Sequence, residues 1–282
     1  MRYAAVEFPR AGLANKLFVL ARAVVYCAEH GGVLLQPNYF SFKLGPLLRR
    51  ETDLRTYLGL FEKHPTVEIG GMRKAVIWAS TKKVFEQSPP PHLCAGAIRV
   101  FRRTCETFDG INGYNELLSS YLQETTRPKW LAAAERVGAV EIGVHVRLGD
   151  LTGHSRHPIE WYVDAVEFVR SIAGPLAVTV FSDGRDSELA PLLAMPGVHV
   201  ARTGSAISDM LALSRSRFLI GTGSSTFSAW AAYLGQMPAM TRVSNPFSWW
   251  ALENVHGRFI GEWNPTCPDE KLIENISALG RQ

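Results

Sequence analysis

The second half of the chain alternates short apolar strands with helices, and this alternation constrains the fold more than any other feature. Runs of β-branched residues bounded by turn residues are followed by stretches whose apolar residues repeat at helical spacing. We predict a strand beginning at 139, strands at 176–181, 198–201, 218–220 and 238–241, and helices at 158–172, 187–194, 207–214 and 227–234. Strands that alternate with helices favour a parallel, doubly wound sheet.

The first half begins with a βαβ unit and is less regular after it. We predict strands at 3–7, 33–36, 67–69 and 75–78, a helix at 13–30 ended by Gly31–Gly32, and a helix at 113–122. A helix at 129–137 leads into the second half, and a C-terminal helix is predicted at 268–280. The loop-like segment Thr126–Pro128 separates the two halves. We therefore expect two α/β domains, residues 1–127 and 128–282.

Composition excludes several classes of protein. A net charge of +4 over 282 residues is too weak and too scattered for nucleic-acid binding. The densest basic cluster, Arg99–Arg103, is interpreted as a solvated surface face. The N-terminal segment meets Glu7 and Pro9 before an apolar core forms, so we expect no signal peptide. No window has the roughly 18 apolar residues of a spanning helix, which predicts a soluble, cytoplasmic protein and leaves peripheral membrane contact open.

The cysteines follow no metal-binding pattern. Cys27, Cys94, Cys105 and Cys267 form no CxxC pair. We interpret them as free thiols in a reducing compartment, with one disulfide left open.

The segment Val144–Asp150 is the strongest candidate for a ligand site. It continues an apolar strand and ends in a cation, a glycine and an acid. In open α/β sheets, ligands bind at this carboxyl edge. Arg147 presents a planar fork of donors that suits a phosphate and stays charged at every relevant pH. His145 lies two residues earlier on the same face of the strand, either as a packed core histidine or as a ligand contact.

The turn Gly221–Phe227 is the second candidate. Glycines followed by Ser and Thr at a helix start place N–H groups and hydroxyls around one point, where the helix dipole adds positive potential. The turn is either a pyrophosphate cradle that needs no metal or an ordinary strand-to-helix turn with a cap. It is not a Walker A loop, because no GK[ST] follows.

Three further residues are at positions from which their side chains could contact a ligand. Asp209 could accept hydrogen bonds from guanine, which offers a ring N–H beside an amino group, or could be a helix N-terminal acid. Asp183 either binds ligand or shapes its turn. Asn15, in the helix start Gly12–Lys16, either contacts a sugar or phosphate or belongs to a simple cap.

Other histidines and tryptophans are weaker candidates. His154 and His157 follow the arginine motif in a loop, where a histidine is usually solvated. Tryptophans at four positions could stack on a sugar but are more often packing residues: Trp230, Trp249, Trp250 and Trp263.

Three blocks of the sequence, in this order, resemble the fucosyltransferase superfamily. They are most similar to the bacterial α-1,2-fucosyltransferases, glycosyltransferase family 11. Arg10–Phe18 resembles GGLGNQMF, Gly143–Asp150 resembles HVRRGD, and Asp209–Trp230 resembles D-x-x-L-M-S-x-C-x-x-x-I-x-x-N-S-T-F-S-W-W. The chain differs at several of these positions, with Ala14, Lys16, Leu148, Gly223–Ser224 and Ala229 in place of the usual residues.

The resemblance implies a GT-B-like enzyme, with two doubly wound α/β domains facing across a cleft. The N-terminal domain would be on the acceptor side and the C-terminal domain would hold the GDP-sugar. The activity implied is inverting transfer of fucose from GDP-fucose to a glycan hydroxyl, α-1,2 in type, without a metal or cofactor. The acceptor and the oligomeric state are left open.

The resemblance also implies roles for single residues. Arg147 would hold the β-phosphate, and Asn15 would reach the fucose. Asp150 is the candidate base, with a loop-shaping hydrogen bond as its alternative role. The residues implied in donor binding are Gly12, His145, Asp183, Asp209, Ser224, Ser225, Thr226 and Phe227.

Three alternative functions are also considered for the same residues. One is a non-catalytic nucleotide-sugar- or glycan-binding protein, and another is a transferase that uses a different GDP-deoxyhexose. A methyltransferase is weakly suggested by the glycine turn. It would need an acid after the next strand, where Thr241–Arg242 stand instead.

Overall fold

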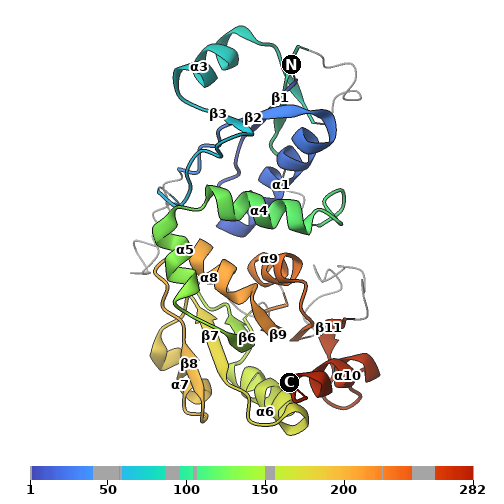
Figure 1. Ribbon diagram of the computed structural model, residues 1–282. Coiled ribbons are helices and arrows are strands. Elements are labelled where there is room, and N and C mark those ends of the chain that lie inside the picture. The colour runs from blue at the N-terminus through green and yellow to red at the C-terminus, as the bar shows by residue number, and fades with distance from the viewer. Residues whose placement is uncertain are drawn as a thin grey trace. The chain divides into compact units, whose positions relative to one another are not determined.

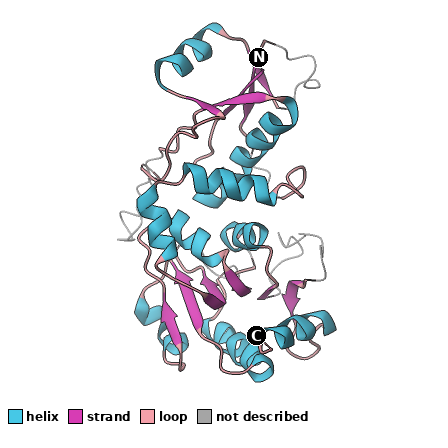
Figure 2. Ribbon diagram, viewed as in Figure 1, coloured by secondary structure: helices cyan, strands magenta, loops and turns pink. Residues whose placement is uncertain are grey.

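The computed structural model describes residues 2–40, 57, 59–86, 96–103, 107–149, 156–223, 225–242 and 258–281. The described residues up to Pro128 form an N-terminal unit, and those from Lys129 onward form a C-terminal unit. Each unit is built around a sheet whose described pairings are all parallel. Figure 2 shows the strands and the helices that surround them. The α/β class predicted from the sequence is confirmed.

The sheet of the N-terminal unit has the strand order β3-β2-β1-β5-β4. Its elements are β1 (Arg2–Val6), α1 (Leu13–His30), β2 (Gly32–Leu35), β3 (Glu68–Ile69), α3 (Gly71–Ser80), β4 (Lys83–Phe85), β5 (Ile98–Phe101) and α4 (Asn115–Thr125). The chain moves outward from β1 to β3 and then crosses to the other side of β1, so the sheet is doubly wound (Figure 1).

The sheet of the C-terminal unit has the strand order β11-β10-β9-β6-β7-β8. Its elements are α5 (Pro128–Glu135), β6 (Val140–Val146), α6 (Ile159–Ala173), β7 (Val178–Ser182), α7 (Asp186–Leu193), β8 (Val198–Val200), α8 (Ala206–Leu213), β9 (Ser216–Gly221), α9 (Thr226–Gly235), β10 (Ala239–Arg242), β11 (Ile260–Trp263) and α10 (Glu270–Leu279). The chain runs outward from β6 to β8 and returns to start β9 beside β6. The strand order therefore reverses between β6 and β9.

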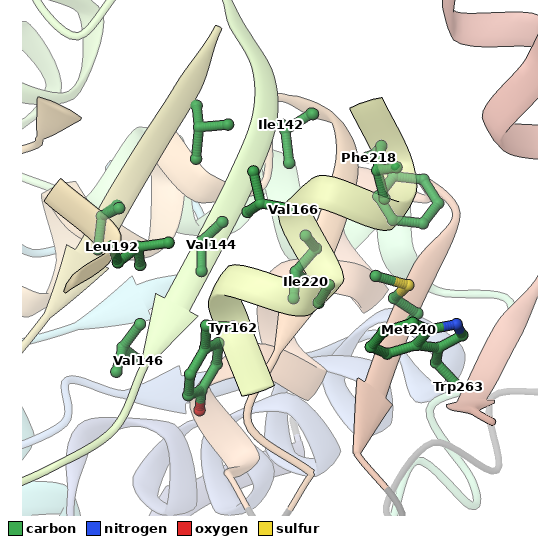
Figure 3. Close-up of a cluster of buried hydrophobic side chains, with 14 of the residues drawn as sticks. Ile142, Val144, Val146, Tyr162, Val166, Leu192, Phe218, Ile220, Met240 and Trp263 are labelled. Atoms are coloured by element: carbon green, nitrogen blue, oxygen red, sulfur yellow. The ribbon is translucent and has the colours of Figure 1, made fainter. Parts of the chain in front are cut away.

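The main core of the C-terminal unit lies under one face of its sheet (Figure 3). Alternate residues of β6, among them Val144 and Val146, contact α6 through Tyr162 and Val166, and all four are fully buried. Parallel strands that are covered on both faces are apolar along most of their length, because both sets of alternate residues are buried. This is why the periodicity of the second half predicted its elements so closely.

Some predictions of secondary structure are wrong, and they concern short elements. Residues 75–78, predicted as a strand, lie inside α3. A four-residue apolar run cannot be told from part of a helix by periodicity. Strands β4, β5 and β11 were not predicted. Arg99, interpreted as surface, lies in β5 and donates through Nη2 to the Glu86 carbonyl at 2.8 Å, whereas Arg102 and Arg103 are exposed.

Gly235 has a packing role at the end of α9. Helix α9 runs through Gly235, and Gln236 takes the left-handed conformation, at φ 55°, that ends it. A Cβ at position 235 would lie 1.8 Å from the Ser214 carbonyl oxygen, just after α8. Only glycine therefore lets the end of α9 approach the end of α8.

We expect Gly235→Ala to destabilise the C-terminal unit by about 1–3 kcal/mol, the usual cost of overpacking. Urea unfolding measures the change. Gly12→Ala is the matched control, because Gly12 has φ −64° and the nearest atom to a Cβ there is 3.9 Å away. Equal unfolding free energies for the two variants would contradict this role of Gly235.

Candidate functional site

The candidate site lies in the C-terminal unit, where the strand order reverses. β6 and β9 are neighbours, and both end at the same edge of the parallel sheet. Arg147 follows β6, and the turn 222–225 joins β9 to α9. Ligands of doubly wound proteins bind at such a reversal point, because the connections leave a crevice there.

Asp183 holds the loop that carries Arg147. Its Oδ1 accepts hydrogen bonds from the amides of Leu148 at 2.8 Å and Gly149 at 3.1 Å. Its Oδ2 lies 3.2 Å from Arg147 Nε. Burial raises the pKa of Asp183, but the guanidinium and the two amides outweigh burial, so the pKa is lowered overall. An ionised carboxylate thus fixes the orientation of the arginine, and both side chains stay about one quarter exposed, at 24% and 25%.

The hydroxyl of Thr222 joins the ends of the two strands. Thr222 is fully buried. Its Oγ1 donates to the His145 carbonyl at 2.9 Å and accepts from the Arg147 amide at 3.1 Å. Tyr162 Oη lies 2.7 Å away, and because Thr222 has used its one proton, Tyr162 is the donor. One side chain therefore sets the spacing between Arg147 and the turn before α9.

His145 belongs to the same buried network. Its Nδ1 lies 2.6 Å from Ser228 Oγ, which also accepts from the Thr222 amide at 3.2 Å. The ring stacks on Phe227, with centroids 4.8 Å apart. Burial lowers the pKa of His145 to about 3; Asp183 opposes this shift and Arg147 adds to it. The imidazole is therefore neutral at pH 7, and its direct contact with a ligand stays a prediction.

His157 is buried, so its interpretation as a solvated loop residue is wrong. It is 1% exposed, and its Nε2 accepts from the Gly223 amide at 3.1 Å. Burial, with a contribution from the charge of Arg242, lowers its pKa to about 4. The residue precedes the N-cap Pro158 and packs on Tyr162, with ring centroids 6.2 Å apart. This is the position of a hydrophobic staple, a signal that could have identified it in the sequence.

The N-terminus of α9 supplies the second half of the site. Ser225 is its N-cap, and no acidic residue lies in the first turn. The first N–H groups of a helix have no acceptor within the helix, and the dipole favours an anion there. Thr226 and Phe227 are partly exposed at this end. Arg147 and this helix end thus direct positive charge to one edge of the sheet.

Asp209 lies in the first turn of α8, which packs against β6, β9 and α9. Its Oδ1 accepts from Thr203 Oγ1 at 2.7 Å. Ser205 is the N-cap of this helix, and its side chain accepts from the Ser208 amide. The structure therefore places Asp209 on a helix that adjoins the strand preceding Arg147.

The remaining predicted residues lie elsewhere. Gly12 is the N-cap of α1 in the N-terminal unit, and Asn15 follows in the first turn. Within the described part of the chain, Asn15 Oδ1 is buried and has no hydrogen-bond partner. Asp150 and Ser224 lie outside the described residues, as do His154, Trp249, Trp250, Cys94 and Cys105.

Two tryptophans are packing residues. Trp230 and Trp263 are 1% and 4% exposed, and they contact Tyr233 and Phe168 respectively. Cys27 and Cys267 are free thiols. Among the residues that the structure describes, no group of three His, Cys, Asp or Glu side chains could hold a metal ion.

A cavity of about 310 Å³ opens beside the arginine loop. It is lined by Leu148, Arg156, His157, Pro158, Ile159 and Glu188. Arg156 and Glu188 form an ion pair at 2.8 Å on its wall. The site therefore adjoins a largely apolar hollow with this ion pair on its wall, large enough for a small ligand group.

Comparison with solved structures identifies the fold. NodZ α-1,6-fucosyltransferase soaked with GDP-fucose is similar at a TM-score of 0.58 and 17% identity, covering 88% of this chain and 97% of that one. A structure of NodZ from Bradyrhizobium gives 0.55 and 17%, covering 84% and 94%. A variant of FUT1 from Arabidopsis thaliana in complex with GDP gives 0.57 and 14%, covering 87% and 71%.

The chain has the GT-B fold of fucosyltransferases. No protein-family model matches the sequence, and no curated protein does. The similarity to these solved fucosyltransferase structures is therefore a similarity of fold, at sequence identities of 14–17%.

We expect stability to fall as the pH drops from about 6.5 to 4, in part because of His157. Its pKa, about 4 when folded against 6.5 for the ordinary group, means that the unfolded state binds more protons over this range. The contribution is complete above pH 6.5. His157→Gln keeps an acceptor for Gly223 but cannot titrate. Between pH 7 and 4, the unfolding free energy of the variant should therefore fall by less than that of the parent, and the difference between the two decreases should be on the order of 1–3 kcal/mol.

Urea unfolding at several pH values measures this difference. His199→Gln is the control, because His199 is an exposed residue of β8. If the parent and His157→Gln show the same pH dependence, His157 does not titrate as a buried neutral group.

Proposed function

We propose that this protein is an inverting glycosyltransferase that moves fucose from GDP-fucose to a glycan hydroxyl without a metal ion. The observation that carries the proposal is the convergence of Arg147 and the α9 N-terminus at the reversal point between β6 and β9. This arrangement suits a diphosphate. The fold shared with structures that contain GDP or GDP-fucose supports the choice of nucleotide.

The proposed catalysis is electrostatic. As the bond between fucose and the β-phosphate breaks, negative charge grows on GDP. A guanidinium held by Asp183 and a helix end held through Thr222 are oriented before the reaction, so they stabilise that charge without rearranging. A base that takes the proton of the acceptor hydroxyl would complete the reaction, and Asp150 stays our candidate for it.

The finer assignments rest on the sequence blocks. We propose an α-1,2 type of linkage from the block Asp209–Trp230, while NodZ is an α-1,6 enzyme by its description. We propose that Asp209 contacts guanine, since α8 packs beside α9 and β6. His145, Ser224, Ser225, Thr226 and Phe227 would surround the diphosphate and nucleoside, with Gly12 and Asn15 of the N-terminal unit contributing at the sugar.

We expect GDP to raise the thermal stability of the protein more than ADP or UDP does, with or without EDTA. Ligand binding stabilises only the folded state, and guanine alone of the three bases offers a ring N–H beside an amino group to a carboxylate. Asp209→Asn should reduce the preference for GDP, because an amide has one acceptor oxygen in place of two. Equal shifts from the three nucleotides would contradict guanine recognition, and a GDP shift lost in EDTA would contradict metal independence.

We expect Arg147→Ala to lower turnover of GDP-fucose by about 100- to 1,000-fold, the usual cost of removing a donor that meets transition-state charge. Arg147→Lys should retain part of the activity, since it keeps the charge but loses the fork. GDP release in the presence of an acceptor is the measurement, with urea unfolding to show that both variants fold. Near-normal turnover in folded Arg147→Ala would refute the role.

We expect Asn15→Ala to lower turnover while GDP affinity changes little. The proposed contact is with the sugar, and an interaction that strengthens as the sugar departs affects turnover and not nucleotide binding. Steady-state kinetics and GDP titration separate the two effects. Parallel loss of GDP affinity would place Asn15 on the nucleotide.

The same assay separates an enzyme from a binding protein. A protein that binds GDP-fucose but releases no GDP with any glycan acceptor would fit the non-catalytic alternative. Turnover of another GDP-deoxyhexose in preference to GDP-fucose would change the donor and keep the reaction class.

A further inference from the structure

Helix α3 of the N-terminal unit presents apolar side chains to solvent. Residues Met72, Ala75, Val76 and Ala79 follow helical spacing on one face, and all four are exposed. Met72 is 80% exposed and Val76 58%. A surface helix of a globular protein normally has the opposite arrangement, with its polar face outward.

The opposite face of α3 provides the attachment to the sheet. Ile77 and Trp78 are partly buried and pack against the core cluster that includes Ala5, Ile98 and Val100. Figure 1 shows α3 on the side of this sheet away from α1. No residue of Gly71–Ser80, all of which the structure describes, is buried. The apolar contact of the helix with the core is thus made by Ile77 and Trp78, while the stripe on its other face is exposed.

The charges around this stripe have one sign. Between residues 70 and 85 the sequence holds Arg73, Lys74, Lys82 and Lys83 and no acidic residue. Lys74 donates to the Gln36 carbonyl at 2.6 Å, and Lys83 lies 5.1 Å over the ring of Trp78. Arg73 and Lys82 are therefore the exposed cations near the stripe.

We propose that α3 is a membrane-contact helix that lies in the surface of an anionic lipid bilayer. Apolar side chains on one face with cations at its border are the features by which a helix enters the interface of a bilayer without spanning it. Anionic headgroups attract the cations, and the apolar stripe enters the boundary between headgroups and acyl chains. None of the described helices combines the length and hydropathy needed to span a bilayer, so the contact is peripheral.

The charge pattern favours lipid over the other occupants of an exposed apolar face. A second copy of this chain would bring the exposed Arg73 and Lys82 against the same two residues, and like charges across an interface oppose association. An acidic protein groove would also match the charge, and the absence of binding to anionic vesicles is the outcome that would fit it. The proposal does not depend on the transfer reaction, because it concerns a surface that no part of the proposed donor site uses.

Sedimentation with vesicles tests the proposal, in the absence of nucleotide. The full chain should bind vesicles of 30% phosphatidylserine in phosphatidylcholine, bind pure phosphatidylcholine at least about tenfold more weakly, and lose binding as salt is raised. Met72→Glu with Val76→Glu should weaken binding to the anionic vesicles by at least about tenfold. Arg73→Gln with Lys82→Gln should weaken it and reduce its salt dependence.

Ile273→Glu is the matched control, since Ile273 is a 37% exposed apolar residue of α10 in the other unit, and it should bind as the parent does. Thermal unfolding shows that each variant is folded, as expected for substitutions at exposed positions. The proposal is overturned if the parent does not bind anionic vesicles. It is also overturned if Met72→Glu with Val76→Glu binds them as strongly as the parent does, or if the parent binds both vesicle types equally. A concentration-dependent dimer that this variant abolishes would assign the face to a second copy instead.

Discussion

The hydrogen bonds of the Thr222 hydroxyl are the constraint on which the candidate site depends. This buried group has one proton and two lone pairs, and the His145 carbonyl, the Arg147 amide and the Tyr162 hydroxyl use all three. It joins the ends of two strands that are 75 residues apart in sequence. A valine of similar shape would remove all three hydrogen bonds and leave the Tyr162 hydroxyl and the His145 carbonyl in a buried place without this partner, at a desolvation cost.

The network extends from Thr222 in both directions. Its own amide donates to Ser228, which also contacts His145, so the first turn of α9 is tied to β6. Gly223 donates to His157, which ties the same turn to the start of α6. The helix end that we assign to phosphate binding is therefore positioned by three connections that do not involve the ligand. This is the kind of preorganisation that electrostatic catalysis requires.

The sequence predicted the fold where burial is continuous and failed where elements are short. Strands β6, β7 and β9 are buried on both faces, so their apolar runs and the helices between them could be recognised. Strand β4 has three residues, too few for periodicity to show, and it was not predicted. Similarly, Arg147 and the turn before α9 were identifiable because ligands bind at strand ends. Thr222, Tyr162 and Ser228 were not, because their roles come from partners 60 to 83 residues away.

The electrostatics of the site are set by permanent charges and not by its histidines. The pKa of His145 is lowered to about 3 and that of His157 to about 4, and burial is the main cause of both shifts. Asp183 is ionised well below neutrality, since Arg147 and two amides lower its pKa overall. The charge that these three groups and the guanidinium present to a phosphate is therefore constant from pH 5 to 8. A change in turnover between pH 5 and 8 would therefore come from the titration of a group other than these four. In the proposed reaction that group is the base that deprotonates the acceptor hydroxyl.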